Sequence, residues 1–230
     1  MTMDELDETT FPAWRDAVAA HDGGDAEPRS YPGVPRARLP AHKPRRFAMS
    51  LDRALAQRRS ASSLGTQLPD DDTLGRILTL AHGITAEHAR GPTPSAGGLQ
   101  AIELFLASWS AGWLPAGWYH FDRAAHALSR IVDGATRDAV AAIIPALVPI
   151  TGGALAWIVV GDHERVRARY TTRTDRFLLL EAGHLMQNLC LASTACDRCT
   201  VPLGGFYERA IARALTLPRT DRVLVTGVLG

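Results

Sequence analysis

Three polar side chains interrupt an apolar stretch of this sequence at helical spacing, and their types could bind a ligand or move a proton. Glu181, His184 and Asn188 stand at positions i, i+3 and i+7 of a predicted helix. A carboxylate, an imidazole and an amide on such a helix can line a substrate pocket. The same groups can instead satisfy buried backbone and interface groups, and both interpretations stay open.

A second segment combines two guanidinium groups with two hydroxyl groups within five residues. Arg58, Arg59, Ser60 and Ser62 lie at the end of a predicted helix over residues 50–59. Guanidinium groups bind oxyanions in a forked geometry, so this segment, called segment 58–62 below, can hold a phosphate and sugar hydroxyls. The alternative is a solvated helix C-terminus, where the helix dipole favours arginine.

Two turns of small residues would let the backbone approach a flat ligand with no side chain in the way. One turn, called turn 94–98 below, comes just before a predicted strand. The other follows a strand and contains Gly204 and Gly205. Ordinary loop turns have a similar composition, so a purely structural role is the alternative. The residues of turn 94–98 are Pro94, Ser95, Ala96, Gly97 and Gly98.

The order of these four segments resembles that of the FMN-dependent nitroreductase superfamily, from about residue 31 to residue 227. The sequence is most similar to the SagB-type branch, the azoline dehydrogenases of peptide natural product pathways. This resemblance implies an α+β, nitroreductase-like fold with a mostly antiparallel central sheet, surrounding helices and a long buried helix. It also implies an intertwined homodimer.

The resemblance also assigns roles to the segments and predicts FMN as the cofactor. In similar proteins segment 58–62 holds the FMN phosphate and ribityl chain, and turn 94–98 of the partner subunit lies against the flavin ring. Backbone N–H groups at Gly204 and Gly205 would stabilise the negative charge of reduced flavin. Gln100 departs from the aromatic residue usual in the SagB-type branch. Basic residues that follow the last strand in many relatives are absent, which predicts weaker retention of FMN.

Arg169 and Tyr170 occupy the place of a Lys-Tyr pair in azoline dehydrogenases. Oxidation of a thiazoline sends a hydride from one carbon to the flavin and removes a proton from its neighbour, so the protein must supply a base. Tyr170 is the expected base, and Arg169 would stabilise its phenolate. Arginine cannot be the base because it stays protonated. A tyrosine packed at a helix end is the alternative.

The expected function is therefore FMN-dependent oxidation of thiazoline or oxazoline rings to thiazoles or oxazoles in a ribosomally synthesised peptide. The expected partners are a second copy of the chain, the peptide substrate and a cyclodehydratase. Two alternatives stay open: an NAD(P)H-dependent nitroreductase or flavin reductase, and a non-catalytic flavoprotein-like subunit of a biosynthetic complex. The sequence has no G-x-G-x-x-G motif and no P-loop, so we expect no separate nicotinamide domain.

Composition argues against several other classes of protein. The formal net charge of +1 predicts no nucleic acid or anionic membrane partner. Three cysteines and an acidic start without a signal-peptide pattern predict a cytoplasmic protein. Polar groups within the apolar run 177–191 argue against a transmembrane helix. Cys196 and Cys199 have the spacing of a metal half-site, but no second pair exists and we expect no metal.

Periodicity and composition predict the elements that must position these residues. Residues 1–47 are rich in Pro, Gly, Asp and Arg, which predicts an extended N-terminal arm, and residues 48–230 then form the FMN-binding, nitroreductase-like domain. A loop is expected over residues 88–98. Helices are expected over 50–59, from 70–72 to Gly83, and over 135–144, 162–170, 174–196 and 207–217. Strands are expected over 102–108, 118–121, 127–131, 155–160, near 200–201, and over 222–228.

Overall fold

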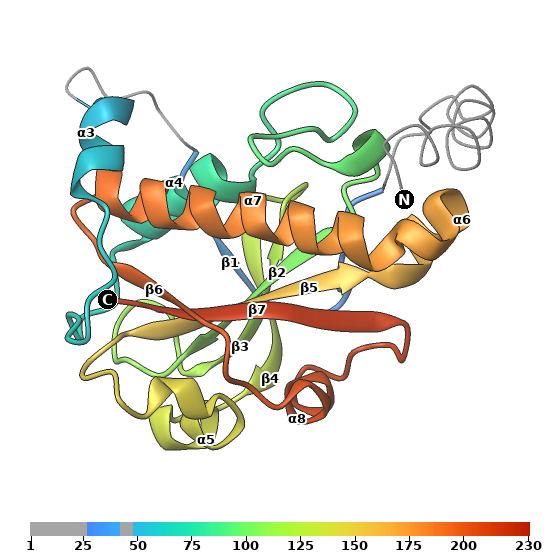
Figure 1. Ribbon diagram of the computed structural model, residues 1–230. Helices are drawn as coiled ribbons and strands as arrows, with labels where there is room; N and C mark the ends of the chain where they lie inside the picture. Colours follow the sequence, from blue (N-terminus) through green and yellow to red (C-terminus); the bar gives the residue numbers. More distant parts are fainter. Residues whose placement is uncertain (1–26, 42–47) are drawn as a thin grey trace, which may run out of the picture.

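The computed structural model describes residues 27–41 and 48–230, which form one sheet with helices on both of its faces (Figure 1). The described residues contain seven strands in the order β1-β4-β3-β2-β5-β7-β6, and every neighbouring pair is antiparallel. This arrangement confirms the expected α+β fold with an antiparallel central sheet. The strands are β1 (Arg36–Arg38), β2 (Ile102–Ser108), β3 (Gly117–Asp122), β4 (Ala127–Asp133), β5 (Leu155–Asp162), β6 (Thr200–Leu203) and β7 (Asp221–Leu229).

The helices form two layers, with α4 and α7 above the sheet and α5 and α8 below it in the view of Figure 1. The long helix α7 crosses the whole upper face, and α3 lies at its C-terminal end. The helices are α3 (Leu51–Gln57), α4 (Asp71–His82), α5 (Arg137–Ile143), α6 (His163–Tyr170), α7 (Thr174–Ala195) and α8 (Glu208–Ala214), with the short 3₁₀ turns η1 (Ala96–Gly98), η2 (Pro145–Leu147) and η3 (Thr171–Arg173).

Capping side chains explain where several helices begin. The side-chain oxygens of Ser50, Asp70 and Thr136 each accept a hydrogen bond from the backbone N–H three residues later. Such a cap satisfies an N–H that has no partner within the helix and contributes about 1 kcal/mol. The predicted start of α3 at Ser50 and the predicted end of α4 at Gly83 are both confirmed.

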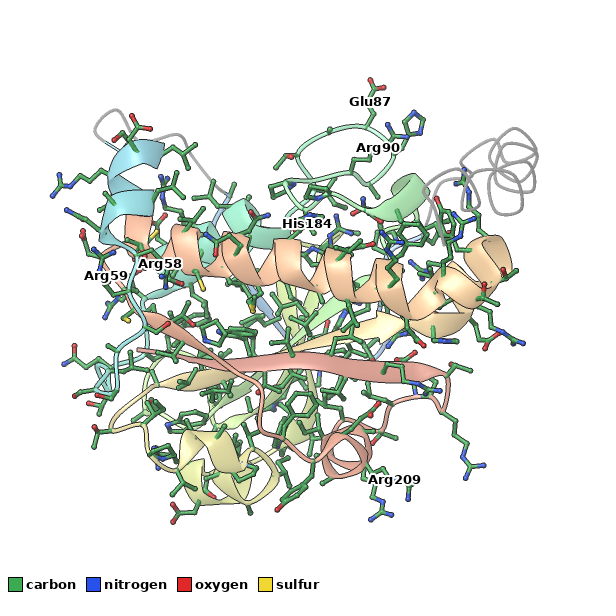
Figure 2. All side chains as sticks on the ribbon, in the orientation of Figure 1. Arg58, Arg59, Glu87, Arg90, His184 and Arg209 are labelled. Carbon is green, nitrogen blue, oxygen red and sulfur yellow. The ribbon has the colours of Figure 1, made fainter. Side chains whose placement is uncertain are left out.

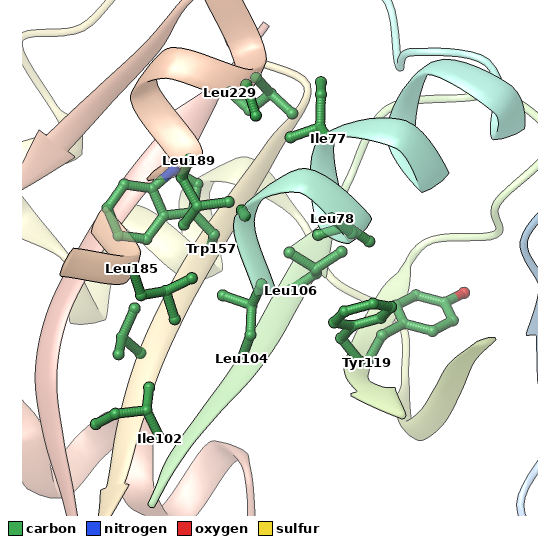
Figure 3. Packing of buried hydrophobic residues seen from close by; sticks show 14 of the residues in the cluster. Ile77, Leu78, Ile102, Leu104, Leu106, Tyr119, Trp157, Leu185, Leu189 and Leu229 are labelled. Atoms are coloured by element: carbon green, nitrogen blue, oxygen red, sulfur yellow. The ribbon is translucent and has the colours of Figure 1, made fainter. Parts of the chain in front are cut away.

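The strand expected over residues 102–108 is confirmed with the same bounds, and it is buried on both faces. Both faces are buried because the two helix layers cover the sheet from opposite sides. On the upper side, Leu185 and Leu189 of α7 and Ile77 of α4 pack with Leu104 and Trp157 of the sheet (Figure 3). Full burial of one such leucine contributes about 1.5–3 kcal/mol, so this layer fixes α7 on the sheet.

Part of the expected N-terminal arm lies within the described residues. Residues 36–38 form the edge strand β1, which pairs with β4 of the same chain. The guanidinium of Arg29 also forms a two-bond ion pair with the carboxylate of Asp221 at the start of β7. A strand of three residues is too short to show an alternating pattern, so periodicity did not predict this strand. The rest of the expected arm, residues 1–26 and 42–47, lies outside the described residues.

One face of α7 is buried, whereas the side chains of Leu179 and Leu180 on its outer face are 58% and 50% exposed. In the part of the chain that the structure describes, no helix is long and apolar enough to span a bilayer.

Candidate functional site

Turn 94–98 is tied to α7 by a side-chain hydrogen bond. The hydroxyl of Ser95 donates to the carboxylate of Glu181 over 2.7 Å, and it accepts the backbone N–H of Gln100 over 2.8 Å. Gly97 and Gly98 adopt positive φ values of 59° and 69°, which favour glycine. The conformation of the turn is therefore stabilised by hydrogen bonds of Ser95 to the buried carboxylate of Glu181 and to the backbone of Gln100.

The end of α6 contacts turn 94–98, which is also bonded to Glu181 of α7. The structure therefore brings together three segments that were predicted separately: the Arg169–Tyr170 pair, turn 94–98 and the polar residue Glu181 of α7. A guanidinium N–H of Arg169 donates to the carbonyl oxygen of Gly97 over 3.0 Å. A Cβ atom added at Gly97 would lie 2.6 Å from the hydroxyl of Tyr170. The ring of Tyr170 packs against that of Phe177, with centroids 4.4 Å apart. The Tyr170 hydroxyl thus faces the backbone of the glycine turn.

Glu181 is the charged group beneath this junction. Its side chain is buried, with 2% of the residue exposed. Burial raises the pKa of the Glu181 carboxyl from its ordinary value of 4.5 to about 7, although the hydrogen bond from Ser95 and the charge of Arg123 oppose the rise. Near neutral pH the group therefore exchanges a proton within hydrogen-bond distance of the turn.

Gln100 is a site residue whose role the sequence did not indicate. Its backbone φ is 49°, and the residue is buried. The side-chain oxygen accepts from Arg123 over 3.0 Å, and the backbone carbonyl accepts from Arg165 over 3.0 Å. Two arginines from distant parts of the chain, together with Ser95, hold this residue in its unusual conformation. Arg123 and Arg165 therefore position turn 94–98 indirectly.

Arg123 also holds the loop that precedes the turn. Its guanidinium donates to the carbonyl oxygens of His82 over 2.7 Å and of Ala89 over 2.9 Å. Because the same side chain also contacts Gln100, one buried cation joins the two ends of the loop. Burial lowers the pKa of Arg123, and the charges of Glu103 and Glu181 oppose this effect.

The other two polar residues of α7 differ in their surroundings. The amide of Asn188 contacts the carbonyl oxygens of Ala81 and Pro92 at 3.3 and 3.2 Å, and the hydroxyl of Thr93 at 3.3 Å. Asn188 of α7 therefore bonds to the backbone of α4 and of the loop that follows it. This is the contact expected if the residue satisfies backbone groups. His184 lies near the middle of α7 with its side chain exposed (Figure 2). A role for either residue in a substrate pocket stays a prediction.

Segment 58–62 lies at the other end of α7 (Figure 2). Turn 94–98 contacts Glu181, and Arg59 lies beside Thr194. The part of α7 between Glu181 and Thr194 is about 20 Å long at the rise of an α-helix. The backbone N–H of Arg58 caps α3, and the carbonyl of Ser62 accepts hydrogen bonds from the backbone and hydroxyl of Thr151. Within one chain, segment 58–62 and turn 94–98 are therefore separate.

Arg59 lines a groove of ≈450 Å³ beside the C-terminal end of α7, together with Ser63, Thr194 and Arg198. Arg198 was not among the predicted binding residues, because it is far from Arg59 in the sequence. The thiol of Cys199 donates to the carbonyl oxygen of Arg59 over 3.5 Å and draws the two segments together. The two guanidinium groups and the Ser63 hydroxyl are donors suited to a phosphate, and the carboxylate of Asp197 also lines this groove.

Gly204 and Gly205 form an exposed turn between β6 and α8. The carbonyl of Gly205 accepts the backbone N–H of Ala146 over 3.1 Å, whereas Gly204 has open space where a side chain would stand. A ligand can therefore approach the backbone of Gly204. The described residues include no group of three or more His, Cys, Asp or Glu side chains that could hold a metal ion.

Comparison with known proteins gives one family. The sequence model of the nitroreductase family matches residues 55–230. MJ1384 of Methanocaldococcus jannaschii, a proposed nitroreductase, is 27% identical over 177 residues, which cover 77% of this chain and 89% of that protein.

Solved structures share the fold. A proposed nitroreductase from Ralstonia eutropha has a TM-score of 0.72 and 21% identity, over 89% of this chain and 93% of that one. A chain of the Escherichia coli microcin synthetase McbBCD complex, solved with truncated pro-MccB17 bound, has a TM-score of 0.60 and 23% identity, over 69% of this chain and 62% of that one. Because the family model spans most of the sequence, this chain belongs to the nitroreductase family, whose members are oxidoreductases that generally bind a flavin.

Proposed function

We propose that the protein is an FMN-dependent azoline dehydrogenase, which oxidises thiazoline or oxazoline rings in a ribosomally synthesised peptide. The observation that carries this proposal is the meeting of Arg169 and Tyr170 with Gly97 of turn 94–98. It puts a group able to accept a proton beside the turn that resembles the flavin-contacting turn of this branch. The microcin synthetase chain of similar fold, solved with truncated pro-MccB17 bound, is consistent with a peptide substrate.

The residues present fit FMN. The glycines of turn 94–98 leave its backbone open to a flat ring, and the buried Nε of Arg169 has no hydrogen-bond partner among the described residues. The groove beside Arg59 and Arg198 has donors for the phosphate. The open backbone at Gly204 can approach the ring. We therefore assign residues 48–230 as the FMN-binding domain.

The separation of the two predicted FMN segments favours a homodimer. Segment 58–62 lies beside the C-terminal end of α7, and turn 94–98 contacts Glu181, about 20 Å away along the helix axis. One FMN molecule that contacts both segments then needs one segment from each of two chains. The exposed Leu179 and Leu180 on the outer face of α7 provide an apolar surface for that association.

The reaction requires a base at the substrate carbon that loses a proton. When bound, FMN supplies the acceptor for the hydride that leaves the neighbouring carbon. The phenolate oxygen of Tyr170 takes the proton, and the guanidinium of Arg169, whose Cζ lies 5.6 Å from the centre of the tyrosine ring, stabilises the negative charge. Because an azoline must form before it is oxidised, we expect a cyclodehydratase to act first.

A second candidate function is NAD(P)H-dependent reduction of nitro compounds or quinones. It is favoured by the likeness to MJ1384, a proposed nitroreductase, and by Gln100 in place of an aromatic residue. Steady oxidation of NAD(P)H by the purified protein, without a thiazoline substrate, would support this candidate.

The test uses the purified protein reconstituted with FMN and a peptide that contains a thiazoline. We expect one FMN per subunit by absorbance and by mass analysis of the released cofactor. We also expect each ring to lose two hydrogen atoms, measured by mass spectrometry. Failure to bind FMN in excess cofactor contradicts the flavin assignment, whereas FMN binding without ring oxidation contradicts only the choice of reaction.

A further inference from the structure

A groove rich in arginine lies on the face of the sheet opposite turn 94–98. Helix α8, the loop after it and the start of β7 form this groove, which has a volume of ≈850 Å³. Arg209 and Arg213 stand one helical turn apart on α8, and Arg219 and Arg222 line the groove from the loop and the strand. Figure 2 shows the Arg209 side chain pointing away from the sheet, below the layer that contains His184.

The positive charge of this groove is largely unbalanced. Asp221 is one of its two acidic residues, and its side chain is 1% exposed and already paired with Arg29. Glu208, in the first turn of α8, is the other. Within residues 27–41 and 48–230, none of the four groove arginines forms an ion pair with a carboxylate, although Arg222 donates to two backbone carbonyls. Carboxylates from a ligand would therefore meet guanidinium groups that are available to bind them.

The groove also has apolar walls between its charges. Ala212, Leu217 and Pro218 line it together with the arginines. A small inorganic anion would contact the guanidinium groups and leave this apolar surface uncovered. A peptide with both acidic and small apolar side chains matches both parts, because arginine binds carboxylates in a forked geometry.

We propose that this groove binds a short acidic peptide segment of a partner protein. The proposal goes beyond the flavin chemistry, because α8 and turn 94–98 lie on opposite sides of the sheet and the binding requires no FMN. It defines a second recognition surface, on which a partner can be held without blocking the candidate active site.

The test is fluorescence anisotropy with the full-length protein and a labelled peptide that alternates glutamate with alanine. We expect binding that weakens as salt rises, because exposed ion pairs are screened. The double variant R209E/R213E should weaken binding by about tenfold or more, which corresponds to about 1.4 kcal/mol. The control variant R38E/R53E makes the same change in net charge at two exposed arginines outside the groove, and we expect its affinity to stay within about twofold of the parent.

Several outcomes would overturn the proposal. They are equal weakening by both double variants, equal binding of a peptide with glutamine in place of glutamate, and displacement by tripolyphosphate as readily as by unlabelled peptide. Circular dichroism and thermal unfolding verify that each variant is folded. If R209E/R213E does not fold, R219Q is measured instead, and unchanged peptide binding by folded R219Q also contradicts the proposal. Peptide binding in this assay does not depend on ring oxidation. Failure of the proposed azoline dehydrogenase activity would therefore neither support nor contradict this proposal.

Discussion

The hydroxyl of Ser95 donates a hydrogen bond of 2.7 Å to the carboxylate of Glu181, a residue 86 positions away in the chain. Because Ser95 also accepts the N–H of Gln100, this single hydroxyl links the glycine turn to the start of β2 and to the long helix. The carboxyl group below it is buried, and its pKa is raised to about 7. The turn is therefore hydrogen-bonded to a buried carboxyl group whose pKa is raised towards neutral pH.

We predict that Glu181→Gln changes how stability depends on pH. The pKa of Glu181 is raised in the folded protein, from an ordinary 4.5 to about 7. Its stabilising contribution is therefore present below pH 4.5 and is lost as the pH rises towards 7. Glutamine keeps an acceptor for Ser95 but does not titrate. Urea unfolding should give similar stabilities for parent and variant at pH 5, and a more stable variant at pH 8. A difference that does not change with pH would contradict the prediction.

We predict that Gly97→Ala harms the site more than Gly134→Ala. Both glycines have positive φ, 59° and 68°, so each alanine should cost about 1–2 kcal/mol of stability. A Cβ at Gly134 has no heavy atom within 4 Å, whereas at Gly97 it would collide with Arg169 and Tyr170. Urea unfolding and ring oxidation measure the two effects. Turnover should fall in G97A and persist in G134A, and equal loss in both would mean that the turn matters only for folding.

Much of the fold could be predicted because its signals are local. The strand over residues 102–108 is a continuous apolar run, and the helix after Asp70 has both a capping residue and an apolar stripe. The strand β1 was not predicted because three residues are too few to show a periodic pattern of apolar and polar side chains. Its place is set by the free edge of β4, which is a tertiary feature.

The candidate site was predictable only in its parts. The glycines of turn 94–98 and the pair Arg169 and Tyr170 were visible as residue types, but their contact arises from the packing of α6 and η1. The three hydrogen bonds that hold Gln100 come from residues as far as 65 positions away, so no local pattern marks them. Arg198 reaches the groove of Arg59 for the same reason.

We predict that Arg58→Ala and Arg198→Ala both weaken FMN binding, whereas Arg38→Ala does not. Loss of one charge-assisted hydrogen bond to a phosphate costs about 1.5–3 kcal/mol, or more than about tenfold in affinity. Arg58 belongs to the predicted phosphate segment, and Arg198 lines the groove beside it. Arg38 is an exposed residue of the edge strand β1 and serves as the matched control. Fluorescence titration of the apoprotein measures the affinities, and equal values for all three variants would refute the assignment.

The last prediction concerns the base. Tyr170→Phe removes one hydroxyl and conserves the ring that packs on Phe177, so the variant should fold and retain FMN. If the hydroxyl is the general base, ring oxidation should slow by about a hundred- to ten-thousandfold. Arg169→Lys should be tolerated because it keeps a cation beside the phenolate. Arg169→Ala should slow turnover by removing that charge and the hydrogen bond to Gly97. Single-turnover ring oxidation, followed by mass spectrometry, measures these rates. A Tyr170→Phe variant that oxidises the peptide at nearly the parent rate would make Tyr170 a packing residue, and Glu181, next to the same turn, would become the first alternative base to test.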